Sequence, residues 1–224
     1  MPDVQKNTDL LREYVQRELD APLFGIASTG QSWFHPEMEH LRKKLPYAVV
    51  IGYKIAYGIT ELLTDGPNQV YLAHYKQVNY LLDKGATQIA QWLEMQGSIA
   101  VPIPASQIVA WDNQYGHFSH RHAAVAAGLA FWGRNNLAIT PQFGAHQRWV
   151  SILTDMPLIP GNKLEMDCGK CHACAKLCPA SAIGESRDDW NYEKCFAKLK
   201  EFAKHGIGHY ICGLCVKPCR GKAK

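Results

Sequence analysis

Apolar positions in the first 162 residues alternate between helical and strand-like spacing. Residues 3–19 carry apolar side chains at helical spacing among charged ones, and this pattern predicts an amphipathic helix. Residues 70–96 repeat apolar side chains every three or four positions, and we expect an interruption near Gly85, because glycine disfavours helix interiors. The Ala-rich residues 119–130 predict a third helix.

Strand-like runs lie between these helices. Residues 47–53, 98–103, 138–140 and 148–154 are short, apolar and rich in β-branched or aromatic side chains. Interleaved helices and strands predict an α/β or α+β body with a central sheet. The Pro- and Gly-containing residues 157–162 predict a linker into the remaining chain.

Composition narrows the class of protein. The chain has 224 residues, of which 47% are hydrophobic and 20% charged, and these values exclude a disordered or collagen-like chain. No apolar run approaches the ~18–20 residues that a membrane span needs, and the first residues lack a signal-peptide pattern. We therefore expect a cytoplasmic protein with no membrane contact. The net charge of +4 is too small to predict a nucleic-acid partner.

The eight cysteines divide the chain in two. All of them lie in the last 57 residues, and no export signal supports a disulfide framework. We therefore predict a cysteine-free body over residues 1–162 and a cysteine-rich domain over residues 163–224.

Cysteine spacing in this domain is typical of iron–sulfur ligation. Cys168, Cys171, Cys174 and Cys178, followed by Pro179, form the bacterial ferredoxin run, whose fourth cysteine ligates the other cluster. Four further cysteines complete two sets of four. The expected sets are Cys168, Cys171, Cys174 and Cys219 for one [4Fe–4S] cluster, and Cys178, Cys195, Cys212 and Cys215 for the other. Structural zinc is the alternative, because CxxC pairs also suit tetrahedral zinc.

The cysteine-rich domain is also basic. Residues 163–224 hold 12 Lys and Arg against 7 Asp and Glu, a net charge of +5, whereas the preceding 162 residues have a net charge of −1. The excess either compensates the negative charge of bound clusters or forms a docking face for an acidic electron donor or for RNA phosphate.

Two bound clusters would form an electron relay, and the body is the expected site of its acceptor. The body has no Gly-rich or Walker-type nucleotide motif. Residues 112–122 instead concentrate a tyrosine, an arginine and three histidines that do not form an HExxH pattern. We expect these groups to donate hydrogen bonds to a bound cofactor. The alternative is a polar helix start whose side chains cap amide groups.

Three segments carry a family resemblance. Residues 127–137 (AGLAFWGRNNL), residues 148–158 (RWVSILTDMPL) and the double-cluster cysteines resemble the cobalamin-dependent iron–sulfur reductases, which include epoxyqueuosine reductases and reductive dehalogenases. The resemblance implies an α+β fold, with a nitroreductase-like α/β body that binds a corrinoid (cobalamin) and a C-terminal ferredoxin-like domain with two [4Fe–4S] clusters. It also implies the same sets of cysteines and an electron donor such as ferredoxin or flavodoxin.

The resemblance and the residue chemistry together assign roles in the body. Tyr115 is the predicted catalytic proton source. The predicted corrinoid contacts are Tyr115, His117, Arg121, Asn135, Asn136 and Arg148.

Two departures affect the expected activity. Gln114 stands where epoxyqueuosine reductases place an aspartate proton donor, and the sequence has no helical-repeat region for tRNA after Cys219. A cobalamin-dependent reductase therefore stays one hypothesis, beside an electron-transfer or cobalamin-carrying protein without a substrate and a corrinoid-free ferredoxin.

Overall fold

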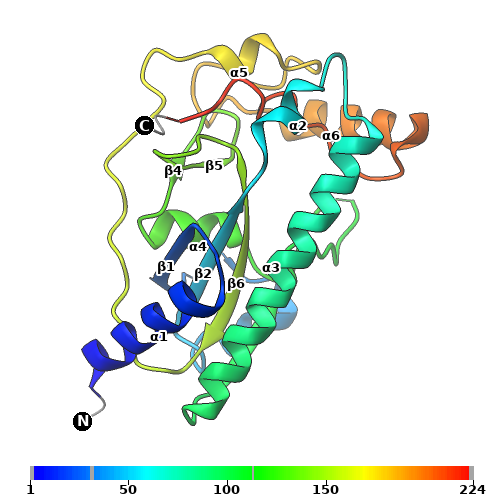
Figure 1. The fold of residues 1–224 in the computed structure, drawn as a ribbon. Helices are drawn as coiled ribbons and strands as arrows, with labels where there is room; N and C mark the ends of the chain where they lie inside the picture. The colour runs from blue at the N-terminus through cyan, green and yellow to red at the C-terminus, as the bar shows by residue number, and fades with distance from the viewer. Residues whose placement is uncertain (1–2, 31–32, 113, 222–224) are drawn as a thin grey trace. The chain divides into compact units, whose positions relative to one another are not determined.

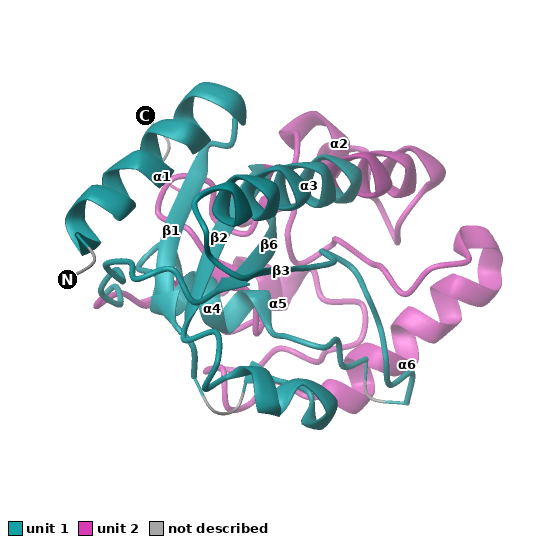
Figure 2. Cartoon of the chain, turned by 90° about the horizontal axis from the view of Figure 1, so that it is seen from below, with its two compact units in different colours: residues 1–53, 79–130, 148–164 teal, residues 54–78, 131–147, 165–224 magenta. Residues whose placement is uncertain are grey.

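The structure is a computed structural model that describes residues 3–30, 33–112 and 114–221. The chain forms two compact units, each assembled from three separate stretches (Figure 2). Unit 1 contains residues 1–53, 79–130 and 148–164, and unit 2 contains residues 54–78, 131–147 and 165–224. None of the described helices is both long and apolar enough to cross a membrane.

A four-stranded sheet forms the centre of unit 1. Its strand order is β1 (Leu23–Ser28), β2 (Tyr47–Lys54), β6 (Gln147–Thr154), β3 (Ala100–Ile103). The pairs β1–β2 and β3–β6 are antiparallel. The central strands β2 and β6 are the most deeply buried, which agrees with the nearly continuous apolar runs in their sequences.

Helices cover both faces of this sheet. Helices α1 (Val4–Glu18) and α3 (Gln69–Met95) lie on one face, and the short α4 (His120–Ala126) lies on the other (Figure 1). The expected interruption of α3 at Gly85 is wrong, because the helix runs through this residue. A Cβ atom at Gly85 would lie 3.0 Å from Ile51 of β2, so glycine allows the helix to pack closely on the sheet.

Residues 157–162, expected to form a linker, belong to unit 1 and pack against the rest of it. The side chain of Asn7 donates to the Pro157 carbonyl at 3.1 Å, and the Ile159 amide donates to Thr8 at 3.0 Å. A Cβ atom at Gly128, where φ is +72°, would lie 2.2 Å from the Asn162 carbonyl oxygen. Glycine is therefore needed at position 128 because the backbone of Asn162 packs directly against this turn.

Unit 2 contains short elements and two small apolar cores. Its elements are α2 (Tyr57–Glu61), the hairpin of β4 (Phe131–Trp132) and β5 (Ala138–Ile139), α5 (Ala173–Lys176), α6 (Tyr192–Phe202) and the π-helical turn η3 (Ala203–Ile207). One core contains Leu63, Tyr71, Leu72, Ile211 and Leu214, with Cys212 packed against it. The other contains Phe131, Ile139, Ala145 and Val216, with Cys168, Cys215 and Cys219 packed against it. Each core thus meets cysteines of the basic domain.

The mixed helix-and-strand class predicted from the sequence is confirmed. The predicted helix at residues 119–130 is shorter in the structure. Strand β1, helix α6 and the 3-10 helix η2 (Pro36–Leu41) were not predicted.

Candidate metal centre

All eight cysteines lie in unit 2 as free thiols. Electrostatic interactions join one group of four. The pKa of Cys174 is raised, first by burial and then by the charges of Cys168 and Cys171. Cys219 interacts with these same three cysteines. The structure therefore brings together the first predicted set.

The other four cysteines form a second neighbourhood. Cys195 interacts with Cys178, and Cys212 interacts with both of them. Cys215 interacts with these three and also with Cys174 of the first group. The second group thus lies beside the first.

Burial keeps several of these thiols protonated. It raises the pKa of Cys212 and of Cys219 to about 11, and it raises the pKa of Cys215 well above that of an ordinary thiol. Because a thiolate is the form that binds metal, metal binding here must release protons. Among the described residues, no group of three or more His, Cys, Asp or Glu side chains meets the geometry of a single metal ion.

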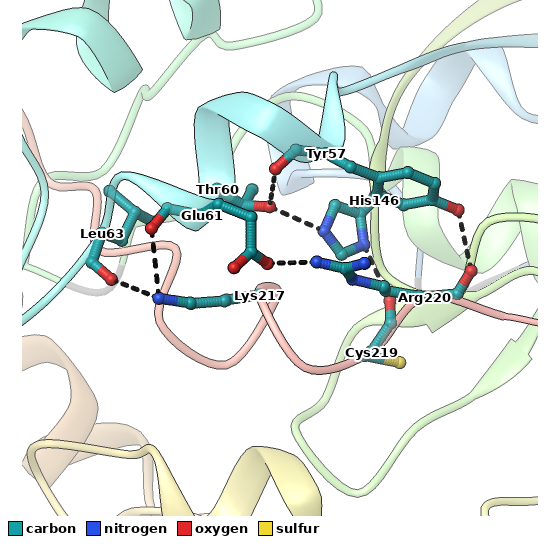
Figure 3. A network of polar contacts seen from close by, with 8 residues as sticks. All are labelled: Tyr57, Thr60, Glu61, Leu63, His146, Lys217, Cys219 and Arg220. Atoms are coloured by element: carbon teal, nitrogen blue, oxygen red, sulfur yellow. Dashed lines mark hydrogen bonds and ion pairs between the residues drawn. The ribbon is translucent and has the colours of Figure 1, made fainter.

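Residues 144–146 contact the backbone of Cys219, and Figure 3 shows the contact made by His146. The amide of Ala145 and Nδ1 of His146 both donate to the Cys219 carbonyl oxygen, at 2.9 Å and 2.8 Å. A Cβ atom at Gly144, where φ is +63°, would lie 2.1 Å from the same oxygen. This loop therefore fixes the position of the last cysteine.

His146 is fully buried and held on several sides. Its Nε2 lies 2.9 Å from Thr60 Oγ1, and the ring of Tyr57 meets it edge-on at 4.6 Å between centroids. Burial lowers the pKa of His146, so the neutral imidazole is favoured. The Cys219 carbonyl only accepts, so Nδ1 carries the hydrogen of the neutral ring. On the other side of the ring, the Thr60 hydroxyl oxygen that faces Nε2 also donates to the Tyr57 carbonyl oxygen at 2.9 Å.

Helix α2 also binds the segment that carries Cys219. Lys217 donates to the carbonyl oxygens of Glu61 and Leu63, at 3.2 Å and 2.7 Å. Arg220 forms an ion pair with the Glu61 carboxylate, and its carbonyl accepts from the Tyr57 hydroxyl at 2.8 Å. Figure 3 shows these contacts on both sides of Cys219. Sequence reasoning missed this network, because its members lie in separate segments without a motif.

The hairpin turn between β4 and β5 contains two of the predicted corrinoid contacts. Asn135 is buried, and its side-chain oxygen accepts from the Leu137 amide at 3.2 Å. Asn136 adopts a positive φ of 56°, and its side-chain oxygen accepts from Arg187 at 2.9 Å. Both side chains thus contribute to the local structure of the turn.

The other four predicted contacts lie in unit 1. Tyr115 is 60% exposed and pairs through its backbone with Ala110. His117 Nδ1 lies 2.6 Å from Gln107 Oε1, and Arg148 donates to Asn79 at 2.5 Å. Arg121 is the second residue of α4, directly after His120. Asn113, in the same sequence stretch, lies outside the described residues.

His120 is the second of the three histidines in residues 112–122, and both of its ring nitrogens are hydrogen-bonded within the protein. Its Nε2 lies 3.1 Å from the Pro104 carbonyl oxygen and its Nδ1 lies 3.0 Å from Ser151 Oγ. The carbonyl accepts only, so Nε2 carries the hydrogen and Nδ1 of the neutral ring accepts from Ser151. Burial lowers the pKa of His120 to about 4. His120 therefore ties α4 to the sheet as a neutral group.

Comparison with known proteins finds reductive dehalogenases and epoxyqueuosine reductases that are similar to this chain. The chain is 33% identical to tetrachloroethene reductive dehalogenase of Sulfurospirillum multivorans over 116 residues, which cover 43% of this chain and 22% of that protein. It is 31% identical to epoxyqueuosine reductase of Bacillus anthracis over 113 residues, which cover 46% of this chain and 30% of that protein. The chain thus matches less than a third of the length of these relatives. No family model matches it.

Solved structures give the same two kinds of neighbour. A catabolic reductive dehalogenase superposes with a TM-score of 0.73 at 20% identity, covering 93% of this chain and 30% of that chain. An epoxyqueuosine reductase bound to a modified tRNA stem loop superposes with a TM-score of 0.68 at 18% identity, covering 97% and 65%. The homologues of the chain are therefore epoxyqueuosine reductases and reductive dehalogenases, as the sequence predicted.

Proposed function

We propose that the chain is a redox protein that binds two [4Fe–4S] clusters in unit 2 and passes electrons from them to a bound corrinoid. The observation that carries this proposal is the gathering of all eight free cysteines in unit 2, in two neighbouring groups of four that meet at Cys174 and Cys215. Four thiolates are the ligand set of a [4Fe–4S] cluster. The buried Arg134 Nε, which has no hydrogen-bond partner among the described residues, supports the fit, because a cluster presents sulfur acceptors.

In this proposal, the cysteine-rich segment forms a ferredoxin-like domain that holds both clusters, and the rest of the chain forms a nitroreductase-like body. Cys168, Cys171, Cys174 and Cys219 would hold one cluster, and Cys178, Cys195, Cys212 and Cys215 the other. When bound, the clusters supply one-electron transfer and the corrinoid supplies a reactive cobalt centre. The chain's own residues position the ligands, exclude water from the buried thiols and supply hydrogen bonds. Tyr115, His117, Arg121, Asn135, Asn136 and Arg148 remain the proposed corrinoid contacts, with Tyr115 as the proton source if a substrate is reduced.

The electron donor in this proposal is a small acidic redox protein such as ferredoxin or flavodoxin. Helix α6 carries Cys195 of the second group and exposes Lys194 and Lys200. Lys198 on the same helix lies close enough to Cys212 to lower its pKa against the larger effect of burial. Reduction by flavodoxin should slow with rising salt and in Lys194→Glu, whereas reduction by dithionite should not depend on Lys194. If reduction by flavodoxin depended equally on salt in wild type and in Lys194→Glu, that result would contradict this docking site.

A cobalamin-handling protein without a substrate of its own is the second candidate. It is favoured by Gln114, an amide that cannot donate a proton as a carboxylic acid does. Anaerobic reconstitution, followed by gel filtration with cobalamin, tests the common part of both candidates. Coelution of cobalamin with the iron-loaded chain is expected, and its failure to bind would leave a corrinoid-free ferredoxin.

A further inference from the structure

Arg134 occupies the turn of the β4–β5 hairpin, and it is 6% exposed. The strands of this hairpin belong to the apolar core against which Cys168, Cys215 and Cys219 pack. Arginine is seldom this deeply buried unless its charge and its five N–H groups are satisfied. The buried guanidinium therefore needs an explanation from its surroundings.

Two of the three guanidinium nitrogens have clear partners. Nη2 donates to the Gly169 carbonyl oxygen at 2.9 Å, and Nη1 donates to the Glu185 carbonyl oxygen. Gly169 follows Cys168 directly, so the first of these bonds holds the loop that begins the cysteine run. Through these bonds, the hairpin fixes two loops of the cysteine-rich domain.

The third nitrogen, Nε, is buried without a hydrogen-bond acceptor among the described residues. A buried donor without an acceptor destabilises the folded state, and a charged donor does so more strongly. No ion pair between Arg134 and a carboxylate is found in the described part of the chain. The side chain therefore has both an unused N–H and an uncompensated positive charge.

The first group of cysteines lies within reach of this charge. Nη2 of Arg134 donates to the carbonyl of the residue that follows Cys168, and the strands of its hairpin belong to the core against which Cys168 and Cys219 pack. A [4Fe–4S] cluster bound by four thiolates is an anion whose sulfur atoms accept hydrogen bonds. It would supply both the acceptor and the counter-charge that Arg134 lacks.

We propose that Arg134 is a positioning residue for the cluster held by Cys168, Cys171, Cys174 and Cys219, and that its Nε–H donates a hydrogen bond to a sulfur atom of that cluster. This inference rests on the proposed function. A hydrogen bond and a positive charge both favour the more negative, reduced cluster. Arg134 therefore raises the reduction potential of this cluster relative to that of the second.

Arg187 provides a matched control. It is exposed, donates from Nε to Asn136 of the same turn at 2.9 Å and covers the ring of Trp132 at 3.7 Å from its centroid. Arg187→Gln removes one positive charge and a side-chain hydrogen bond from this hairpin, whereas Arg134→Gln removes one positive charge and two hydrogen bonds to backbone carbonyls. A purely structural effect on the turn should therefore appear in both variants.

The test is a redox titration of the anaerobically reconstituted full chain, followed by electron paramagnetic resonance. Arg134→Gln should shift the reduction equilibrium of one cluster about tenfold toward the oxidised form, which is about 59 mV for one electron. The other cluster should keep its potential, and Arg187→Gln should change neither. Unchanged potentials in an iron-replete Arg134→Gln protein would overturn the inference.

A second measurement does not require that variant to fold. Wild-type protein labelled with ¹⁵N-arginine should show a ¹⁵N coupling to one reduced cluster, and this coupling should persist in Arg187→Gln and vanish in Arg134→Lys. Its absence from the cluster-loaded wild type would overturn the role of Arg134 while leaving the proposed function intact. Wild-type protein that never forms a [4Fe–4S] signal would instead refute the proposed function, and the inference with it.

Discussion

His146 donates from Nδ1 to the carbonyl oxygen of Cys219 at 2.8 Å, and this bond connects a buried imidazole to the last cysteine of the chain. Thr60 on α2 lies on the opposite side of the same ring. The position of Cys219 thus depends on residues that precede it by 73 and 159 positions in the sequence.

Removal of the His146 ring should destabilise unit 2. His146→Ala leaves a cavity and removes a donor from the Cys219 carbonyl, and we expect a loss of about 2–4 kcal/mol in the free energy of unfolding. Urea unfolding of the iron-free protein measures this loss. The exposed His209→Ala is the control and should remain within about 0.5 kcal/mol of wild type. An equal loss in both variants would show that the buried contacts of His146 are not the cause.

Gly144→Ala should impair cluster binding as well as folding. The added Cβ would lie 2.1 Å from the Cys219 carbonyl oxygen, so this backbone must move. Gly206→Ala is the matched control, because Gly206 has a positive φ of 97° and open space around its Cβ position. Gly206→Ala should cost about 1–2 kcal/mol from backbone strain alone and keep normal iron content. Normal iron content in Gly144→Ala would contradict the proposed fixation of Cys219.

Stability should depend on pH through His120. Its pKa is about 4 in the folded protein, against 6.5 for an ordinary histidine. Between these values the unfolded chain binds the proton more readily, so acidification from pH 6.5 to 4 lowers the free energy of unfolding, and stability is fully present above pH 6.5. The contribution of His120 is up to about 3 kcal/mol.

The variant His120→Gln isolates this contribution, because other titrating groups remain. Urea unfolding at pH 7 and pH 5 should show a smaller loss of stability on acidification for His120→Gln than for wild type. Identical losses in the two proteins would mean that His120 does not titrate with a depressed pKa.

The two groups of cysteines predict a crossed pattern of cluster loss. Cys178→Ser should disturb the cluster assigned to Cys195, Cys212 and Cys215, although Cys178 belongs to the sequence run of the first group. Cys219→Ser should disturb the other cluster. Electron paramagnetic resonance of each reduced variant should show loss or change of a different signal. Loss of the same signal in both variants would refute the division.

The helices, the strands and the cysteine groups could be predicted from the sequence far better than the contacts of Thr60, Glu61 and His146 that surround Cys219. Spacing of two and three residues between thiols directly reflects ligand geometry, so Cys168 to Cys178 form a recognisable pattern. The long α3 was predicted because its apolar side chains recur at helical spacing, but its continuity through Gly85 depends on close packing against Ile51. Such packing is a property of the tertiary structure and leaves no local signal.

Local sequence patterns also do not predict which stretches of the chain make up each unit. Residues 54–78 and 131–147 cluster with the cysteine-rich segment, although they precede it in the sequence. Thr60, Arg134 and His146 all come from these stretches. Arg134 belonged to a recognised motif, yet only its buried, unpartnered Nε indicated a role, whereas His146 had no motif at all.

Mössbauer spectroscopy of the anaerobically reconstituted, ⁵⁷Fe-loaded chain, combined with iron, sulfide and zinc analysis, tests the central claim most directly. The account predicts two [4Fe–4S] clusters, and hence about eight iron and eight sulfide per chain, without zinc. Two tightly bound zinc ions per chain, with no sulfide and no [4Fe–4S] spectrum, would contradict it.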